Sequence, residues 1–207
     1  MLQRFRDFWT KVFSGPADLL LRLGVTPDQV TIVGTVGVVA AALWFFPRGQ
    51  LLVGVLVITA FVFSDLMDGY MARKSGLSSN WGAFLDSTMD RFGDAAILGG
   101  LLLYYAGPHA ETMVGEPKLY VYLSLACLVL GSITSYVRAR AESLGMTAKV
   151  GVAERAERLV LILVATGFNA IFSLPILTEV ALWLLAAASG ITVVQRMIVV
   201  RRQAKSA

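Results

Sequence analysis

Four aspartates in one short stretch carry the chemistry that this sequence supports. Asp65 and Asp68 are three residues apart and Asp86 and Asp90 are four apart, so each pair shares one face of a helix. The turn-rich segment 76–82 between them predicts two antiparallel helices that bring the four carboxylates together. Carboxylates this close repel one another unless cations lie between them, and hard oxygen ligands suit magnesium or manganese. The stretch therefore predicts a divalent-metal site; solvated or salt-bridged acids at helix ends are disfavoured by the apolar flanks.

The residues beside the aspartates suit a phosphate-containing substrate. Two divalent cations would balance four carboxylates, and a metal pair of this kind suits phosphoryl-group transfer. Gly69 allows a backbone to approach closely, Ala72 keeps the aspartate face shallow, and Arg73 offers a guanidinium fork to a phosphate. Close helix packing is the alternative explanation for Gly69 and Ala72. We expect two Mg²⁺ ions as cofactor, with Mn²⁺ also suitable.

The spacing of these residues resembles the signature of the CDP-alcohol phosphotransferase family. All of its fixed positions are met, by Asp65, Asp68, Gly69, Ala72, Arg73, Gly82, Asp86 and Asp90. The segments GAFLDSTMDR, ARAESLGM and GVAERAERL are most similar to the phosphatidylinositol phosphate synthases of actinobacteria. The resemblance covers essentially the whole chain. It implies one family domain over residues 1–207, CDP-diacylglycerol as the donor substrate, and a homodimer.

The resemblance also implies roles for particular residues. The four aspartates would bind the metal ions, and Asp90 would also be the general base that takes the proton of the attacking hydroxyl group. CDP-diacylglycerol would be bound by Asp28, Gln29, Val30, Thr31, Gly69, Arg73 and Ser79. Asp28 stands where the family more often has asparagine, and an ionised aspartate cannot donate the hydrogen bond that asparagine donates. An acceptor hydroxyl would attack the phosphorus attached to diacylglycerol, and CMP would leave.

Basic residues near the ends of the last three predicted spans point to an anionic acceptor. They are Arg138, Arg140, Lys149, Arg155, Arg158 and Arg196. Guanidinium groups in a polar recess suit a phosphate. We expect the acceptor to be inositol phosphate, bound by Arg138, Arg155 and Arg196, and the resemblance favours the last two. Anchoring of membrane spans by basic residues is the alternative explanation for any single one.

Two other functions are compatible with these residues. Glycerol 3-phosphate as the acceptor would make the protein a phosphatidylglycerol phosphate synthase. Intramembrane carboxylates also occur in divalent-cation transporters, but Arg73 and the placement of the acids at one membrane edge disfavour transport.

Three further acids lie near the predicted site. Asp94 continues the Asp86–Asp90 helix face one turn deeper, outside the signature, so it has a supporting role or none. Glu154 and Glu157 are expected to form structural pairs with neighbouring arginines.

Composition predicts an all-α integral membrane protein. Of the 207 residues 57% are hydrophobic and 15% charged, and the mean hydropathy is +0.70, more apolar than a soluble domain requires. The formal charge of +4 does not indicate nucleic-acid binding, because the basic residues lie at the ends of apolar runs. The single cysteine, Cys127, excludes an intramolecular disulfide and is expected in the core.

Hydropathy predicts six transmembrane helices after an amphipathic interfacial helix. The interfacial helix is expected over residues 2–14, ended by Gly15 and Pro16. Thr26 is expected to cap the first span, with Pro27 as its first residue. The spans are expected at about 27–46, 51–74, 82–105, 119–144, 151–168 and 175–200.

The distribution of basic residues predicts the orientation. Six spans place both termini on one side, and all of the 18 lysines and arginines except Arg48 and Lys118 fall on that side. Basic residues concentrate on the cytoplasmic side of membrane proteins. We therefore expect cytoplasmic termini and a cytoplasmic aspartate site in a bacterial cell (inner) membrane, where lipids reach the site from the bilayer.

Overall fold

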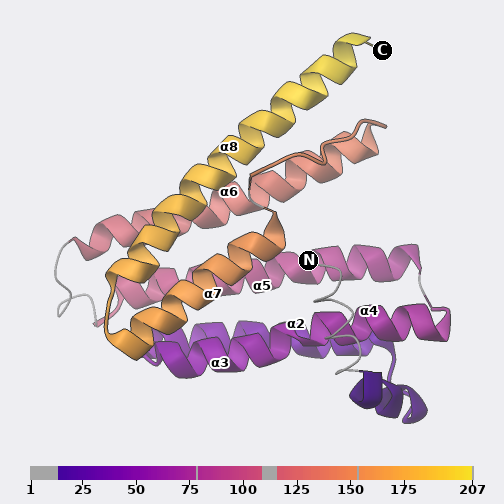
Figure 1. The fold of residues 1–207 in the computed structure, drawn as a ribbon, viewed down its shortest axis with the longest axis horizontal. Coiled ribbons are helices and arrows are strands. Elements are labelled where there is room, and N and C mark those ends of the chain that lie inside the picture. The colour runs from indigo at the N-terminus through magenta and orange to yellow at the C-terminus, as the bar shows by residue number, and fades with distance from the viewer. Residues whose placement is uncertain (1–13, 78, 109–115, 153, 207) are drawn as a thin grey trace.

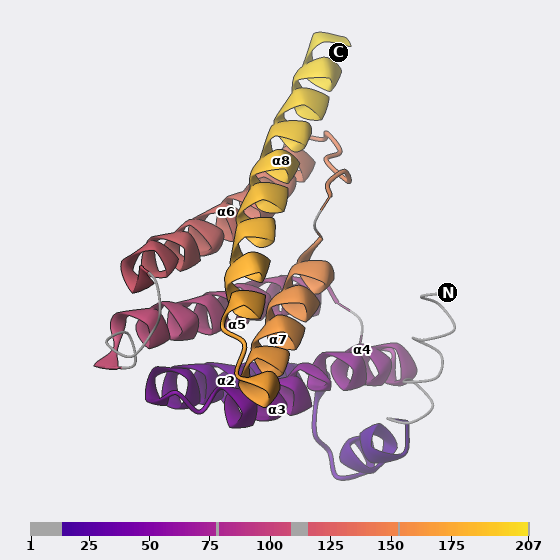
Figure 2. The same ribbon diagram turned by 60° about the vertical axis from the view of Figure 1, so that its left-hand side comes forward.

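The computed structural model describes residues 14–77, 79–108, 116–152 and 154–206, apart from the side chains of Asp65, Leu66 and Ser206. Every regular element in this part of the chain is a helix, and the helices run side by side over most of the molecule (Figures 1 and 2). The interfacial helix predicted over residues 2–14 falls outside the described residues except for Ser14.

The first described segment, residues 14–22, is helical. Gly15 and Pro16, which were predicted to end the interfacial helix, lie in this helical segment. Whether the interfacial helix ends there stays a prediction, and the neighbouring Ala17 is fully buried. A turn then leads to the first long helix.

Helix α2, Pro27–Phe45, begins as the sequence predicts. The Thr26 side chain accepts a hydrogen bond from the backbone of Gln29, and the Gln29 side chain accepts one from the backbone of Thr26. This capping box and the proline at the first helical position define the start of the helix. The short 3₁₀ helix η1, Phe46–Arg48, follows, and Gly49 turns the chain in the left-handed region at φ 73°.

The second predicted span is divided into α3, Leu51–Val62, and α4, Ser64–Ser75, with a break at Phe63. The Ser64 hydroxyl donates to the carbonyl oxygen of Phe61 at 2.6 Å, and back-bonding of this kind bends helices. A Cβ atom on Gly34 of α2 would lie only 2.0 Å from the Ser64 hydroxyl oxygen, so Gly34 lets α2 approach the break. The break sets the direction of α4, which carries half of the signature.

The remaining helices are α5, Asn80–Ala106; α6, Pro117–Ser143; α7, Arg155–Phe172; and α8, Ile176–Ser206. Helix α7 begins four residues later than predicted. The backbone N–H of Glu154 donates to the Glu157 carboxylate at 2.9 Å in a second capping box, so these two acids start the helix. Residues 145–152 instead form a loop.

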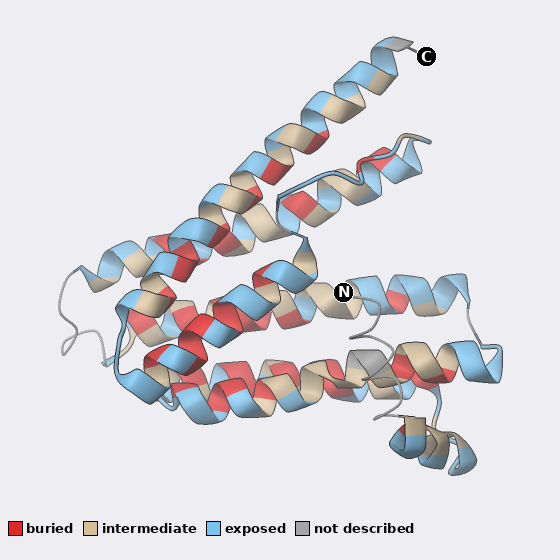
Figure 3. Ribbon diagram, viewed as in Figure 1, coloured by how far each residue is buried: buried red, intermediate tan, exposed pale blue. Residues whose placement is uncertain are grey.

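The helices enclose one apolar core. Helix α2 packs against α3, α4 and α5. Helix α6 packs against α5 and α8, and helix α7 packs against α3 and α8. Buried residues lie on the faces that the helices turn toward one another (Figure 3). Ile58, Leu101, Leu182 and Cys127 are fully buried, as expected for the cysteine. Helix α8 and the end of α6 project beyond the other helices and carry the C-terminus away from them (Figure 1).

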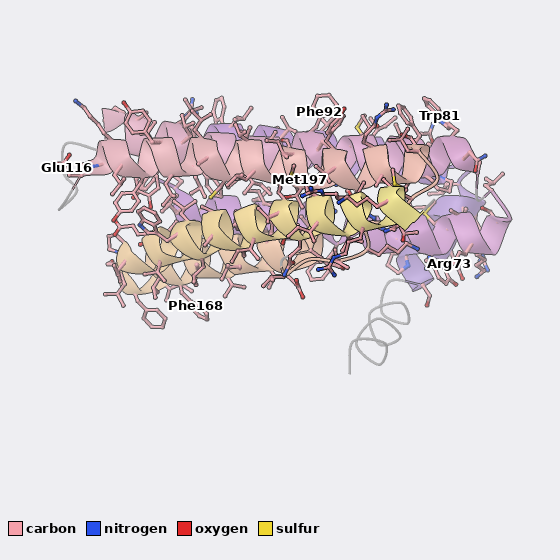
Figure 4. The ribbon with its side chains drawn as sticks, turned by 90° about the horizontal axis from the view of Figure 1, so that it is seen from above. Arg73, Trp81, Phe92, Glu116, Phe168 and Met197 are labelled. Atoms are coloured by element: carbon pink, nitrogen blue, oxygen red, sulfur yellow. The ribbon has the colours of Figure 1, made fainter. Side chains whose placement is uncertain are left out.

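The outward faces are apolar, as lipid contact requires. Phe92 and Phe168 point away from the bundle in Figure 4, and they and Met197 are each about half exposed. Four helical stretches are long and apolar enough to cross a membrane: 27–48, 51–75, 117–143 and 176–205. The chain is thus an all-helical integral membrane protein. Helices α5 and α7 are not among these four stretches, and both carry charged residues of the site described next.

Candidate active site

The signature stretch, residues 65–90, forms nearly all of α4, the segment that links it to α5, and the first part of α5. Gly76 ends α4 in the left-handed region at φ 69°, a conformation that glycine adopts without strain. The Ser79 hydroxyl then caps α5 by accepting from the backbone N–H of Gly82 at 3.0 Å. Both helices pack against α2, so the two halves of the signature face a common helix. Arg73 and Trp81 mark this end of the bundle in Figure 4, opposite Glu116.

The described signature carboxylates differ in their surroundings. Asp68 is 6% exposed and accepts a hydrogen bond from the Thr31 hydroxyl of α2. Asp90 is partly buried and lies beside two guanidinium groups, those of Arg155 and Arg91. Asp86 lies between them along the site and lines both of the cavities defined below. The side chain of Asp65 lies outside the described part of the structure, so its predicted role stays a prediction.

One cavity, of about 270 Å³, is built from α2, α4 and the start of α5. We call it the signature cavity. Its lining residues are Pro27, Asp28, Thr31, Asp68, Gly69, Ala72, Arg73, Leu77, Ser79, Gly82, Ala83 and Asp86. A Cβ atom on Gly69 would lie 3.4 Å from Nη1 of Arg73, so the absence of a side chain there keeps room around this guanidinium. The cavity therefore offers a guanidinium for a phosphate and small residues that allow close approach, whereas its carboxylates need a bound cation before an anionic ligand can lie beside them.

Most, but not all, of the residues predicted to bind CDP-diacylglycerol meet in the signature cavity. Asp28 and Thr31 line it, and the Asp28 carboxylate accepts from the indole N–H of Trp81 at 3.0 Å. An asparagine carbonyl oxygen could accept the same bond, so this contact does not require aspartate. The Gln29 side chain instead caps α2, and Val30 is not among the residues that line the cavity.

A second cavity, of about 490 Å³, lies on the other side of Asp86. We call it the arginine cavity, because five arginines from α5, α6, α7 and α8 line it. They are Arg91, Arg138, Arg155, Arg158 and Arg196. The three arginines predicted to bind the acceptor are among them, whereas Arg140 and Lys149, also noted in the sequence, are not.

Acidic residues pair with several of these arginines. Nη1 of Arg155 lies 2.8 Å from Oδ1 of Asp90, and Nε of Arg155 lies 3.2 Å from Oδ1 of Asp94. Arg138 pairs with Glu142 at 3.1 Å within α6. The sequence did not reveal these cross-helix pairs, although the four-residue spacing of Asp94 after Asp90 placed it on the correct face.

Arg196 is the most deeply placed of the predicted acceptor residues. It is 4% exposed, and it donates to the carbonyl oxygens of Val150 at 2.9 Å and Thr134 at 2.6 Å. Thr192, one turn earlier on α8, accepts from the backbone N–H of Val152 at 3.1 Å. Arg196 therefore fastens the 145–152 loop to α6 and α8 while its guanidinium borders the arginine cavity.

The donor atoms of the signature fit a divalent metal. They are carboxylate oxygens, the hard ligands that Mg²⁺ and Mn²⁺ prefer, and a cationic guanidinium already pairs with Asp90. Among the described side chains, which exclude Asp65, no three potential ligands lie close enough together to hold an ion. The chemistry of the site fits the metal, and its ligand geometry stays a prediction.

The model of the CDP-alcohol phosphatidyltransferase family matches residues 24–200 of the chain. The chain belongs to this family. Family membership confirms the resemblance seen in the signature and excludes the transporter alternative as the main activity.

Named family members are similar over their whole lengths. The phosphatidylinositol phosphate synthase of Cutibacterium acnes is 51% identical over all of both chains. That of Mycolicibacterium smegmatis is 42% identical over 95% of this chain and 86% of its own.

Two crystal structures of the phosphatidylinositol phosphate synthase of Mycobacterium tuberculosis share the fold. The one with CDP-DAG bound superposes with a TM-score of 0.83 at 41% identity, over 92% of this chain and 94% of that one. The one in complex with manganese and citrate gives 0.80 at 42% identity, over 90% and 87%. The chain is thus a metal-dependent phospholipid-synthesising transferase of this family.

Proposed function

We propose that this enzyme transfers the phosphatidyl group of CDP-diacylglycerol to a hydroxyl of inositol phosphate, releasing CMP and forming phosphatidylinositol phosphate. The observation that carries the proposal is that Asp86 borders both cavities. The carboxylate row thus separates a cavity suited to a nucleotide diphosphate from a cavity lined by five arginines. Substrates bound in the two cavities would meet at the carboxylates.

The residues have distinct roles in this reaction. Arg73 pairs with the pyrophosphate of the donor, and the small residues Gly69 and Ala72 let it lie close to α4. The acceptor phosphate binds to guanidinium groups of the arginine cavity, including Arg138 and Arg155. The acceptor oxygen then forms a bond to the phosphorus attached to diacylglycerol, the bond from that phosphorus to the CMP oxygen breaks, and Asp90 takes the hydroxyl proton.

Asp65, Asp68, Asp86 and Asp90 would hold the metal, which we propose to be two Mg²⁺ ions, with Mn²⁺ as a substitute. Bound there, the cations would offset the negative charge of the pyrophosphate and of the leaving CMP. The hydrogen bond from Thr31 fixes the Asp68 carboxylate toward the signature cavity.

Acceptor competition tests the proposal. Purified enzyme in detergent with CDP-diacylglycerol and Mg²⁺ is expected to release CMP when inositol phosphate is added, and much more slowly with glycerol 3-phosphate. Faster turnover with glycerol 3-phosphate would assign the arginine cavity to that acceptor and overturn the proposed one. CMP release that does not require a divalent cation would contradict the metal role.

We further propose six spans, cytoplasmic termini in a bacterial cell membrane, and a homodimer. The basic residues at the ends of α6, α7 and α8 support this orientation. In a Cys127→Ala background, Gln50→Cys is expected to react with an impermeant maleimide in intact cells, and Lys205→Cys only after permeabilisation. The reverse pattern would contradict the orientation. Light scattering of the detergent complex would test for the dimer.

A further inference from the structure

Asp94 lies outside the family signature, yet its carboxylate holds two arginines of α7. Its Oδ1 lies 3.2 Å from Nε of Arg155, and its Oδ2 lies 3.8 Å from Nη2 of Arg158. Arg158 is 8% exposed, and a buried guanidinium needs a counter-charge. Asp94 thus joins α5 to α7 behind the arginine cavity.

Arg155 is shared between two carboxylates. Its Nη1 meets Asp90, the proposed general base, while its Nε meets Asp94 one helical turn further along α5. A guanidinium presents its donors as a planar fork, so the direction in which Nε points fixes the direction of the other nitrogens. The position of Asp94 therefore sets how the Arg155 guanidinium approaches Asp90.

The same guanidinium competes with any cation at Asp90. An arginine that pairs closely with a carboxylate occupies its lone pairs, and bidentate pairing is the strongest arrangement. A second carboxylate on Nε draws positive charge away from Asp90. It also keeps Arg155 at the border of the arginine cavity, where an acceptor phosphate reaches it.

We propose that Asp94 is a positioning residue that holds Arg155 so that Asp90 stays available to a divalent cation and to the acceptor hydroxyl. Its effect on the acceptor rests on the proposed function, whereas its effect on cation binding does not. Asp94 touches neither substrate in this arrangement and acts through Arg155.

Asp94→Asn tests this role because it keeps the shape of the side chain and removes its charge. Binding of Mn²⁺ to the full-length protein in detergent, measured by electron paramagnetic resonance, is expected to weaken about three- to tenfold, the size of one partly screened charge-assisted hydrogen bond. Glu142→Gln is the matched control, because it removes one negative charge from the lining of the arginine cavity but contacts Arg138 rather than Arg155.

An Arg155→Ala background separates an effect of Asp94 that acts through Arg155 from a direct electrostatic effect of the Asp94 charge on the cation. There, Asp94→Asn is expected to change Mn²⁺ affinity no more than Glu142→Gln does. An equal loss with and without Arg155 would show that Asp94 acts through space and would overturn the proposal. If Asp94→Asn does not fold, Asp94→Glu replaces it and must give a smaller shift of the same sign.

Kinetics provide the second readout. Asp94→Asn is expected to raise the KM for inositol phosphate about tenfold and to leave the KM for CDP-diacylglycerol within about twofold, with partial rescue by Asp94→Glu. Unchanged acceptor KM would contradict the positioning role. A wild-type enzyme that does not use inositol phosphate would refute the proposed acceptor instead, and the Mn²⁺ measurements would still decide the role of Asp94.

Discussion

The two cavities that meet at Asp86 are built on different physical principles. The signature cavity contains one arginine, Arg73, and owes its shape to small residues such as Gly69 and Ala72. The arginine cavity contains five arginines, and several of them already pair with carboxylates. In the proposed reaction the first would recognise its ligand by close backbone approach, and the second by charge that is shared with the protein's own acids. Substitutions should therefore act on the two substrates separately, except where the cavities join.

Asp86→Asn is expected to have the largest effect, because Asp86 belongs to both cavities. We expect kcat/KM for both substrates to fall at least about a hundredfold, since the loss of one charged ligand removes several kcal/mol of transition-state stabilisation. The rate of CMP release from CDP-diacylglycerol, with each substrate varied in turn, measures both kcat/KM values.

Asp18→Asn is the matched control for Asp86→Asn. Asp18 pairs with Lys74 of α4 at 2.6 Å and lines neither cavity. The hydrogen bond from Lys74 lowers the pKa of Asp18, so the substitution removes a charge at neutral pH. A comparable loss in this variant would show that activity depends on charge around α4 in general.

Of the two substrates, Arg155→Ala is expected to affect the acceptor and not the donor. A charge-assisted hydrogen bond to phosphate contributes about 1.5–3 kcal/mol, which corresponds to roughly a ten- to hundredfold rise in the KM for inositol phosphate. Arg155→Lys should recover part of this loss, because lysine keeps the charge without the fork. Steady-state kinetics with each substrate varied in turn would decide, and an equal change in the KM for CDP-diacylglycerol would contradict the division between the cavities.

Arg73→Ala is the corresponding test of the signature cavity. It is expected to raise the KM for CDP-diacylglycerol about tenfold and to leave the KM for inositol phosphate within about twofold. The smaller effect follows from the exposed position of Arg73 near the end of α4, where solvent screens the charge. If Arg73→Ala instead raised the KM for inositol phosphate, the substrates assigned to the two cavities would have to be exchanged.

Arg196→Ala is expected to affect stability more than specificity. Its guanidinium donates to the backbone carbonyl oxygens of Val150 in the 145–152 loop and Thr134 in α6, so its loss removes both of these hydrogen bonds. We expect a melting temperature lowered by several degrees in detergent and an acceptor KM raised less than in Arg155→Ala. Arg138→Ala, which removes a more exposed arginine paired with Glu142, is the control and should leave the melting temperature within about 1 °C. An unchanged melting temperature in Arg196→Ala would instead favour a direct role of this residue in binding the acceptor substrate.

The sequence predicted the helices well where apolar length decides them. The start of α2 at Pro27 was predicted from its capping residues, and local capping is visible in sequence. The break at Phe63 was not, because the apolar run continues through it and its cause, Ser64 against Gly34, is a contact between distant residues. Glu154 and Glu157 were interpreted as partners of arginines, although their three-residue spacing also suits a cap.

Some features of the candidate site could also be predicted from the sequence, and others depend on contacts between distant residues. The signature was recognisable because the chemistry requires fixed residue types at fixed spacing on two helices. The pairing of Arg155 with Asp90 and Asp94 depends on how α7 lies against α5, which spacing along either helix does not determine. The sequence likewise did not show that Gln29 caps its own helix rather than facing the signature cavity. The metal role of Asp65 stays a prediction.

The order of the two cavities along the chain has a consequence for how such enzymes diversify. The signature cavity is formed entirely by residues 27–86, whereas four of the five arginines of the other cavity lie between Arg138 and Arg196. A recombination event after α5 would therefore exchange the polyol-binding half and leave the nucleotide-binding half intact. Enzymes that make lipids with new headgroups would then arise by replacement of one contiguous half of the gene. A chimaera of two family members joined within residues 107–116 would reproduce that step in the laboratory.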